Sequence, residues 1–247
     1  MMKTLFQTGG PFQELTVTRQ GKVLTLWSAA GIRHTVFDSG SPHVPGLEYA
    51  RNLLAALAFC PRAPSCLVLG LGGGSVPRML AAARPEMEVD AVEIDPAVVD
   101  VAGAYFDVRA LPRLRIHLED AAVFLRASTS RYAIVVVDTY LGGRFPEQCA
   151  GAGFFRDIRR CLPDDGVLAV NWMRGDGRAE QALLDNLRAV SGQVWRLPGL
   201  RSRNVLYFAP ARKTTRAAIL SAAQAAGADI PFENALARLA HRLRESA

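Results

Sequence analysis

Short apolar runs alternate with amphipathic stretches along the chain from residue 65 onward. The apolar runs predict strands at 65–72, 88–95, 113–120, 133–140 and 166–173. Segments with helical periodicity follow at 75–84, 96–105, 121–127, 151–161 and 178–191. Strands and helices in this order predict an α/β, Rossmann-like fold with a mostly parallel sheet. Because several strands are apolar throughout, we expect helices on both faces of that sheet.

A different pattern precedes this region. Residues 12–38 alternate polar and apolar side chains in three segments, separated by turns at Gln20-Gly21 and Ala30-Gly31. Such alternation predicts a small antiparallel β-meander. Helical periodicity over 47–59 predicts one helix between the meander and the parallel sheet.

The last third of the chain departs from the parallel pattern as well. Residues 193–199 and 204–211 form two strand-like segments that we expect to pair as an antiparallel hairpin at one sheet edge. The tail carries two amphipathic stretches separated by Gly227 and Pro231. We therefore expect three parts, which are an N-terminal meander, a central α/β domain and C-terminal helices, at 1–45, 46–212 and 213–247.

Composition excludes some classes of function. The 247 residues carry a net charge of +6, but the densest arginine groups, near Arg113, Arg159 and Arg242, lie far apart in the sequence. We therefore expect no nucleic-acid partner, since such a partner requires clustered cations. The four cysteines form no CxxC pair and have no histidine at ligand spacing, so we expect neither a metal site nor a disulfide framework.

Membrane and secretion signals are absent from the sequence. The first fifteen residues lack the apolar core of a signal peptide, and no window approaches 18 uninterrupted apolar residues. Reduced thiols fit the same picture. We expect a cytoplasmic protein without a membrane partner.

Four glycines fall within five positions in the stretch LVLGLGGGSVPRML at 67–80. Glycine lets the backbone approach a ligand closely, and the helix that follows offers free N–H groups to a polar ligand. The stretch is no P-loop, because no Gly-Lys-Ser/Thr follows. Gly70 and Gly72 fit a dinucleotide-binding GxGxxG motif, whereas Ser75 occupies its third position. The alternative is a tight turn without a ligand.

Carboxylates end the next three predicted strands: Glu93 and Asp95, then Glu119 and Asp120, then Asp138. Ligands of open parallel sheets bind at these carboxyl ends. Glu93 is placed to accept hydrogen bonds from ribose hydroxyls, which suits both NAD and S-adenosylmethionine. Asp120 is placed to accept from an adenine amino group. As an alternative, each is a solvent-exposed carboxylate at a strand end.

The set of motifs resembles the polyamine aminopropyltransferases, spermidine synthase and its relatives, within the class I S-adenosylmethionine-dependent methyltransferase fold. The resemblance rests on the upstream meander, the glycine loop with Arg78, and the segments VEIDPAVVDVAGAYF, HLEDAAVFL and CLPDDGVLAV. It implies that S-adenosylmethionine or its decarboxylated form binds as the donor substrate and that an amine is the acceptor. A homodimer is the common assembly of that family.

The resemblance also implies roles for individual residues. Gly70, Gly72 and Gly74 would pass close to the sulfur-bearing chain of the donor. Glu93, with Asp95 beside it, would bind the ribose, and Asp120 the adenine. Asp138 falls on the first aspartate of the family's DxxDP loop, where it would take up or orient the proton of the acceptor amine.

Several positions depart from the family pattern. In the family, an aspartate of the glycine loop holds the donor amine, and this chain has Ser75 at that place. The second aspartate of the family's DxxDP loop is Leu141 here. The family's YHE triplet is Tyr49-Ala50-Arg51, and Asn171 replaces a glutamine. We expect an atypical acceptor pocket of Tyr49, Tyr140, Glu147 and Asn171. Residues 139–154 form either a lid over this acceptor pocket or an ordinary surface loop. As a lid, they would bring Glu147 to the pocket as a substitute for the missing carboxylate.

Several functions remain open at this stage. The first is an aminopropyltransferase-like enzyme with an unusual acceptor, and close to it is a methyltransferase that uses intact S-adenosylmethionine. The loss of an aspartate at Ser75 favours the methyltransferase, since an acid there would repel the donor carboxylate. A non-catalytic nucleoside-binding protein is another alternative. An NAD-dependent oxidoreductase is disfavoured by Ser75 and by the antiparallel last strands.

Overall fold

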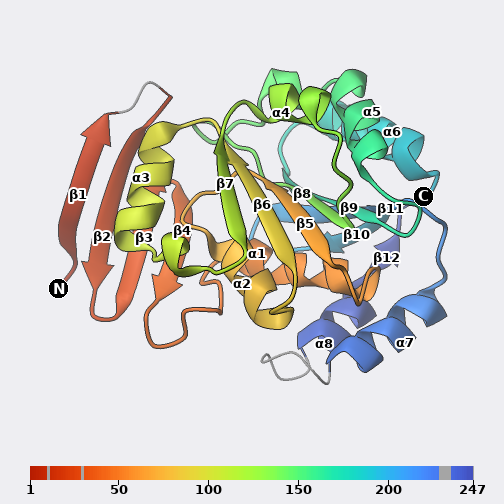
Figure 1. Cartoon of the computed structure of the whole chain (residues 1–247), viewed down its shortest axis with the longest axis horizontal. Coiled ribbons are helices and arrows are strands. Elements are labelled where there is room, and N and C mark those ends of the chain that lie inside the picture. The colour runs from red at the N-terminus through yellow and green to blue at the C-terminus, as the bar shows by residue number, and fades with distance from the viewer. Residues whose placement is uncertain (10–11, 29–30, 228–234, 247) are drawn as a thin grey trace.

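The computed structural model describes residues 1–9, 12–28, 31–227 and 235–246. The expected turn residue Ala30 and the expected helix break at Pro231 lie outside these ranges. Within them, the chain forms a small N-terminal sheet, a large central sheet and helices that cover the large sheet (Figure 1).

The central sheet has eight strands in the order β12-β10-β11-β9-β8-β5-β6-β7. Strands β5 to β9 are parallel, and β10, β11 and β12 run antiparallel to their neighbours. The bounds are β5 Ser65–Leu69, β6 Glu88–Glu93, β7 Leu114–Leu118, β8 Ile134–Val137, β9 Val167–Met173, β10 Trp195–Pro198, β11 Asn204–Pro210 and β12 Arg244–Glu245. The predicted mostly parallel sheet with antiparallel last strands is confirmed.

Two details of this sheet differ from the prediction. The hairpin strand β11 lies inside the sheet, hydrogen-bonded to β9, with β10 outside it. The edge itself is the two-residue strand β12, which pairs with β10 through Trp195 and Arg196. A two-residue strand carries no periodicity, so no pattern in the sequence predicted it.

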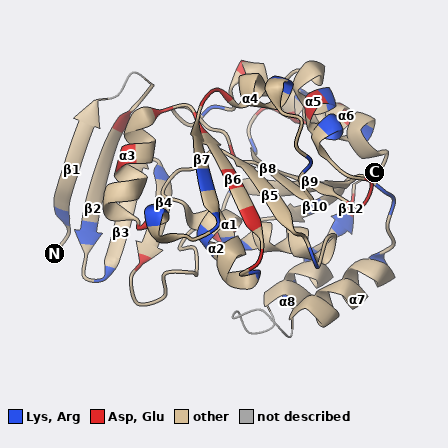
Figure 2. Cartoon of the chain, in the orientation of Figure 1, with Lys and Arg blue, Asp and Glu red and all other residues tan. Residues whose placement is uncertain are grey.

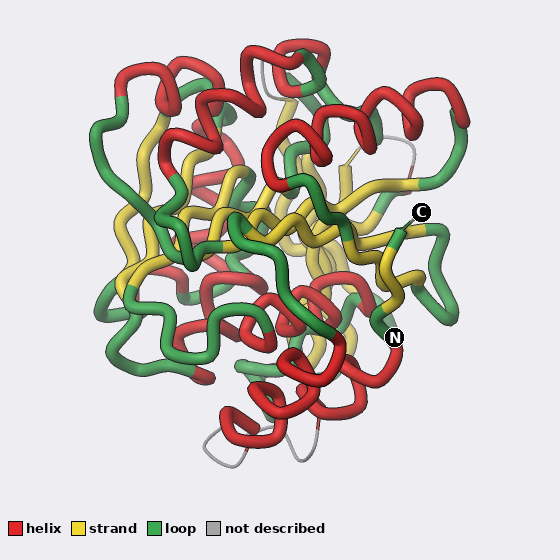
Figure 3. Tube along the Cα trace, turned by 90° about the vertical axis from the view of Figure 1, so that its right-hand side faces the viewer, coloured by secondary structure: helices red, strands yellow, loops and turns green. Residues whose placement is uncertain are grey.

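Helices cover both faces of the central sheet (Figure 3). Helices α2, α7 and α8 share a core with one face, and α4, α5 and α6 with the other. Their bounds are α2 Ser75–Ala83, α4 Ala121–Ala127, α5 Ala152–Cys161, α6 Gly177–Ser191, α7 Arg216–Gly227 and α8 Ala235–Arg242. The five helices predicted between the strands of the α/β region start and end within a residue or two of their predicted bounds.

The helix predicted at 47–59 is divided in two. Helix α1 covers Glu48–Asn52, and a 3-10 helix continues over Leu53–Ala58. All six residues of the 3-10 helix are buried, so the tighter winding occurs where the segment packs into the core. Two short 3-10 turns lie at Val108–Ala110 and Glu147–Cys149.

The N-terminal sheet has four antiparallel strands, β1 Lys3–Gly9, β2 Glu14–Gln20, β3 Val23–Ser28 and β4 Arg33–Asp38. Strand β1 was not predicted, because its side chains are exposed or half-buried throughout and do not alternate. The sheet packs on helix α3, Pro96–Tyr105, through a core that includes Leu15, Phe37 and Phe106. This contact fixes the small sheet beside the edge of the large one.

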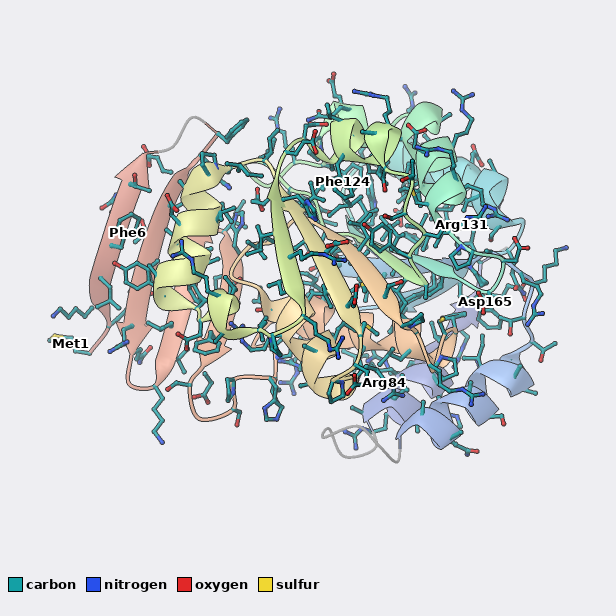
Figure 4. The ribbon with its side chains drawn as sticks, in the orientation of Figure 1. Met1, Phe6, Arg84, Phe124, Arg131 and Asp165 are labelled. Carbon is teal, nitrogen blue, oxygen red and sulfur yellow. The ribbon has the colours of Figure 1, made fainter. Side chains whose placement is uncertain are left out.

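The C-terminal helices belong to the same core as the central sheet. Ile219 of α7 and Leu236 of α8 are buried with residues of β5, β9 and β11. Arg84, directly after α2, lies beside these helices (Figure 4) and donates hydrogen bonds to the carbonyls of Pro61 and Ala226. One core thus joins the C-terminal helices to the α/β region.

Charged residues are spread over both sheets and their helices (Figure 2). In the described ranges, no helix has both the length and the hydropathy needed to cross a bilayer.

Candidate active site

A pocket lies at the carboxyl ends of the parallel strands, between the central sheet and strand β4. Its wall is made by the glycine loop after β5, the segments that follow β6, β7 and β8, the end of β9, and parts of β4 and α1. Most of the predicted site residues line it, namely Gly70, Gly72, Ser75, Glu93, Asp120, Asp138, Tyr49, Tyr140 and Asn171.

Three predicted residues lie outside this lining. Gly74 adopts a left-handed conformation (φ +73°) before α2 and packs against Val108. Asp95 is fully buried, and its Oδ1 accepts a hydrogen bond from the backbone N–H of Ala97 at 2.9 Å, which caps helix α3. Glu147 is exposed at the start of a 3-10 turn. None of the three lines the pocket, and their contact with a ligand stays a prediction.

Gly70 is required by the close approach of two strands. Its φ is +98°, and a Cβ atom there would collide with the backbone carbonyl of Asp138. Its N–H donates to the carbonyl of Val92 at 2.8 Å. The glycine therefore lets the ends of β5, β6 and β8 converge, which brings the backbone and the acid of the pocket together.

Glu93 holds the glycine loop while it faces the pocket. Its Oε2 accepts from the N–H of Leu71 at 3.0 Å, and its Oε1 accepts from the N–H of Asp95 at 3.1 Å. Burial raises the pKa of this carboxyl, and these backbone hydrogen bonds oppose the shift. Each carboxylate oxygen can accept more than one hydrogen bond, so both can also receive hydroxyl donors from a ligand.

Asp120 is fixed in a similar way. Its Oδ1 accepts from the N–H groups of Ala122 and Val123 at 2.8 and 3.1 Å, which caps α4. Its Oδ2 accepts from Nε2 of Gln148 at 3.2 Å. Gln148 follows β8 in the chain, so this bond ties the segment after β8 to the wall after β7.

Asp138 is the acid with the strongest perturbation in the pocket. Burial raises its pKa to about 7; hydrogen bonds from Asn171 and Tyr49 oppose this shift, and the charge of Glu93 adds to it. Nδ2 of Asn171 donates to its Oδ1 at 2.7 Å, and Nδ2 of Asn204 donates to Oδ1 of Asn171 at 2.8 Å. The carboxyl group is thus both oriented and poised to exchange a proton near neutral pH.

The N-terminal sheet supplies residues that the sequence reasoning missed. Gln13, Arg33, His34 and Thr35 line the pocket. The buried Oγ1 of Thr35 accepts from the N–H of Gly73 at 2.8 Å. A Cβ atom on Gly73 would lie only 2.7 Å from Thr35 Cγ2, so β4 packs directly on the glycine loop. No local signal marks a contact between residues 38 positions apart.

The segment after β8 covers one side of the pocket. Leu141 and Arg144 pair through two backbone hydrogen bonds of 3.0 Å, and Gly143 packs against the side chain of Ile32 from the N-terminal sheet. The ring of Phe145 lies 5.9 Å from that of Tyr140 and 5.5 Å from that of Trp172. The segment predicted as either a lid or a surface loop therefore contacts both sheets in this structure, and whether it acts as a lid stays a prediction.

Metal chemistry has no evident ligand set here. In the described part of the chain, no three His, Cys, Asp or Glu side chains are grouped so that they could hold an ion.

Known proteins are similar to this chain in sequence and in fold. The family model "Spermine/spermidine synthase domain" matches residues 49–194. A polyamine aminopropyltransferase of Vibrio vulnificus is 36% identical over 126 residues, which is 50% of this chain but only 42% of the relative. A polyamine aminopropyltransferase of Neisseria meningitidis is 27% identical over 203 residues, covering 80% of this chain and 76% of the relative.

A solved structure agrees over almost the whole chain. The crystal structure of a probable spermidine synthase from Corynebacterium glutamicum superposes with a TM-score of 0.77 at 17% identity, and it covers 92% of this chain and 95% of the other. This likeness confirms the predicted fold, a Rossmann-like sheet preceded by a small β-meander. The family model matches more than half of the residues, and the chain therefore belongs to the spermine/spermidine synthase family.

Proposed function

We propose that the protein is an alkyltransferase that binds S-adenosylmethionine or its decarboxylated form and transfers an aminopropyl group to an amine. The observation that carries the proposal is Asp138, a carboxyl group with a pKa near 7 that shares one pocket with the glycine loop and Glu93. This pairing of a proton acceptor with a nucleoside-type cradle suits attack of an amine on a sulfonium carbon.

The donor would lie over the ends of β5, β6 and β7. Glu93 would accept hydrogen bonds from the two ribose hydroxyls and Asp120 from the adenine amino group; both residues line the pocket at neighbouring strand ends, which supports these roles. Gly70 and Gly72 line the pocket together with Asp138, so the sulfonium centre would lie beside this loop and near the acid.

Transfer is a single displacement. The amine lone pair attacks the carbon beside the sulfonium, a C–N bond forms, and the C–S electron pair returns to sulfur as a neutral thioether. The amine arrives as an ammonium, so a proton must leave it, and ionised Asp138 is the acceptor for that proton. Alignment of the amine with the sulfonium carbon supplies the rest of the rate enhancement.

Methyl transfer from intact S-adenosylmethionine is the second candidate, and Arg33 favours it. Its side chain lines the pocket, where it is available to pair with the donor carboxylate. Ser75, the first residue of α2, also lines the pocket and adds no negative charge. Both residues suit a donor that keeps its carboxylate.

The by-product separates these alternatives. The protein is incubated with each donor and a mixture of primary amines, and the nucleosides are analysed by mass spectrometry. Aminopropyl transfer releases methylthioadenosine from the decarboxylated donor, and methyl transfer releases S-adenosylhomocysteine from the intact donor. If neither product exceeds the level given by the Asp138→Asn variant, the chain catalyses neither transfer and the proposal fails. All four cysteines are buried and unpaired, so the assay is run under reducing conditions that match the expected cytoplasmic location.

A further inference from the structure

The acidic residues of the pocket are all on one side. Glu93 ends β6, Glu119 and Asp120 follow β7, and Asp138 follows β8. The strand order continues from β8 to β9 and β11, and the described lining residues there contain no acid. The lining on that side consists of Tyr140, Leu141, Asn171, Met173 and Asn204.

The carboxyl group of Asp138 already has hydrogen-bond partners and a role in the proposed reaction. It accepts from Asn171, and Tyr49 also hydrogen-bonds to it. In the proposed reaction the same carboxylate takes the proton of the reacting amine. A second ammonium at the far end of the acceptor would therefore need another carboxylate, because a buried cation without a partner is strongly disfavoured.

Neighbouring acids do not supply that partner. Glu48 accepts from the N–H groups of Leu200 and Arg201 at 2.6 and 2.9 Å, so it holds the β10–β11 connection. Glu147 is exposed and lies outside the pocket lining.

Three arginines lie next in sequence to lining residues on this side of the pocket. Arg144, Arg174 and Arg203 are exposed and directly follow or precede the lining residues Gly143, Met173 and Asn204. The guanidinium of Arg203 donates to the carbonyl of Arg174 at 2.8 Å, which keeps two of them together. Among the described residues none of the three forms a salt bridge, so no carboxylate neutralises their charge near this side of the pocket.

We infer that the acceptor is a monoamine, a primary amine whose remote end is neutral or anionic, rather than a diamine. The inference rests on the proposed transfer function. The remote end lies between Leu141 and the β9–β11 pair, where apolar and amide groups line the pocket and arginines flank it.

Three acceptors of equal length test this directly. They are 1,4-diaminobutane, 4-aminobutan-1-ol and 4-aminobutanoate, which differ only in a cationic, neutral or anionic end. We expect kcat/KM for the better of the two monoamines to exceed that for the diamine by about tenfold or more, because like charges in a desolvated site repel. A diamine that equals or exceeds both monoamines overturns the inference.

Binding separates this test from the proposed function. The same three amines are titrated calorimetrically into protein saturated with methylthioadenosine. Absence of turnover with every amine refutes the transferase proposal, yet the order of affinities still decides the acceptor class. Weaker binding of the diamine supports the inference, and tighter binding overturns it.

Leu141 gives a matched pair of variants. Its side chain lines the pocket, whereas its turn is held by backbone hydrogen bonds to Arg144, so replacement leaves the turn intact. Leu141→Asp adds a carboxylate beside the remote end, and Leu141→Asn adds a neutral group of equal size. Relative to Leu141→Asn, we expect Leu141→Asp to raise the preference for the diamine over 4-aminobutanoate by about tenfold. An equal preference in the two variants contradicts the placement.

Discussion

The buried environment of Asp138 determines the pH range in which its carboxyl group can accept a proton. Since burial raises its pKa to about 7, its carboxyl is ionised in about half of the molecules at neutral pH. We predict that kcat/KM at saturating donor rises with pH through an apparent pKa near 7. Asp138→Asn should lower kcat by about 10²–10⁴-fold and abolish this inflection. A rate that is independent of pH between 5 and 8 would exclude Asp138 as the proton acceptor.

The same shift predicts a pH-dependent cost to stability. The folded pKa of Asp138 lies above the value of about 3.9 expected in the unfolded chain, so folding disfavours the charged form. The penalty grows from about pH 4 to pH 7 and is complete above it. Asp138→Asn removes it, and we expect the variant to gain about 2–3 kcal/mol relative to the parent between pH 5 and pH 8. Urea unfolding of both proteins at pH 5 and pH 8 measures the difference in unfolding free energy between variant and parent. If that difference is the same at the two pH values, the prediction is wrong.

Glu93 combines a structural and a binding role, and two substitutions separate them. Glu93→Ala removes all acceptors and should weaken methylthioadenosine binding by about 1–3 kcal/mol. Glu93→Gln keeps one oxygen for the N–H of Leu71 or for a hydroxyl, so its loss should be smaller. Calorimetry gives both affinities. If Glu93→Ala binds as tightly as the parent, the ribose lies elsewhere.

Individual residues also show how far local sequence patterns reach. The glycines and strand-end acids were predictable, because strand ends of a parallel sheet meet at one edge. Asp95 precedes Pro96, and this Asp-Pro pair is typical of a helix N-cap followed by proline, which is the role that it has. Thr35 had no such signal, since its partner Gly73 is brought near only by the tertiary fold.

Strand β4 and the glycine loop act as one element, joined by Thr35. Thr35→Val keeps the shape of the side chain but leaves the N–H of Gly73 without its partner, which should cost about 1–3 kcal/mol of unfolding free energy. Thr35→Ser keeps the hydroxyl, so it should retain donor affinity. Urea unfolding and calorimetry with methylthioadenosine compare the two. Equal donor affinity in both variants would show that the hydrogen bond does not shape the loop.

Elements were predicted to the extent that burial imposed a period on the sequence. The continuously apolar strands β5, β8 and β9 and the amphipathic helices α5 and α6 show this. Strand β1 has no buried face, so it has no period that identifies it. The helical period over 47–59 identified a helix but not the 3-10 winding of Leu53–Ala58, where all six residues are buried.

Across the whole molecule, the order of strands divides the pocket. Strands β5, β6 and β7 present the glycine loop and most acids, and β8, β9 and β11 present Asp138 and the amide pair Asn171–Asn204. The N-terminal sheet closes the pocket from the opposite side through β4. Three segments that are distant in the sequence therefore build one site, and its third wall depends on how the small sheet docks.

That docking depends on Phe106, which is fully buried between α3 and the N-terminal sheet. Its ring meets that of Phe37 edge-on at 6.1 Å, and its carbonyl accepts a hydrogen bond from the buried Arg78 of α2. Phe106→Ala should cost about 3–5 kcal/mol and loosen β4 against the glycine loop, so methylthioadenosine affinity should fall as well.

The matched control is Phe208→Ala, which truncates an equally buried ring in β11, within the core on the other side of the molecule from this interface. We expect a similar loss of stability but an unchanged affinity for methylthioadenosine, measured where both variants remain folded. If the two variants lose affinity equally, the effect reflects general destabilisation. If only Phe106→Ala loses affinity for methylthioadenosine, the docking of the N-terminal sheet contributes to donor binding.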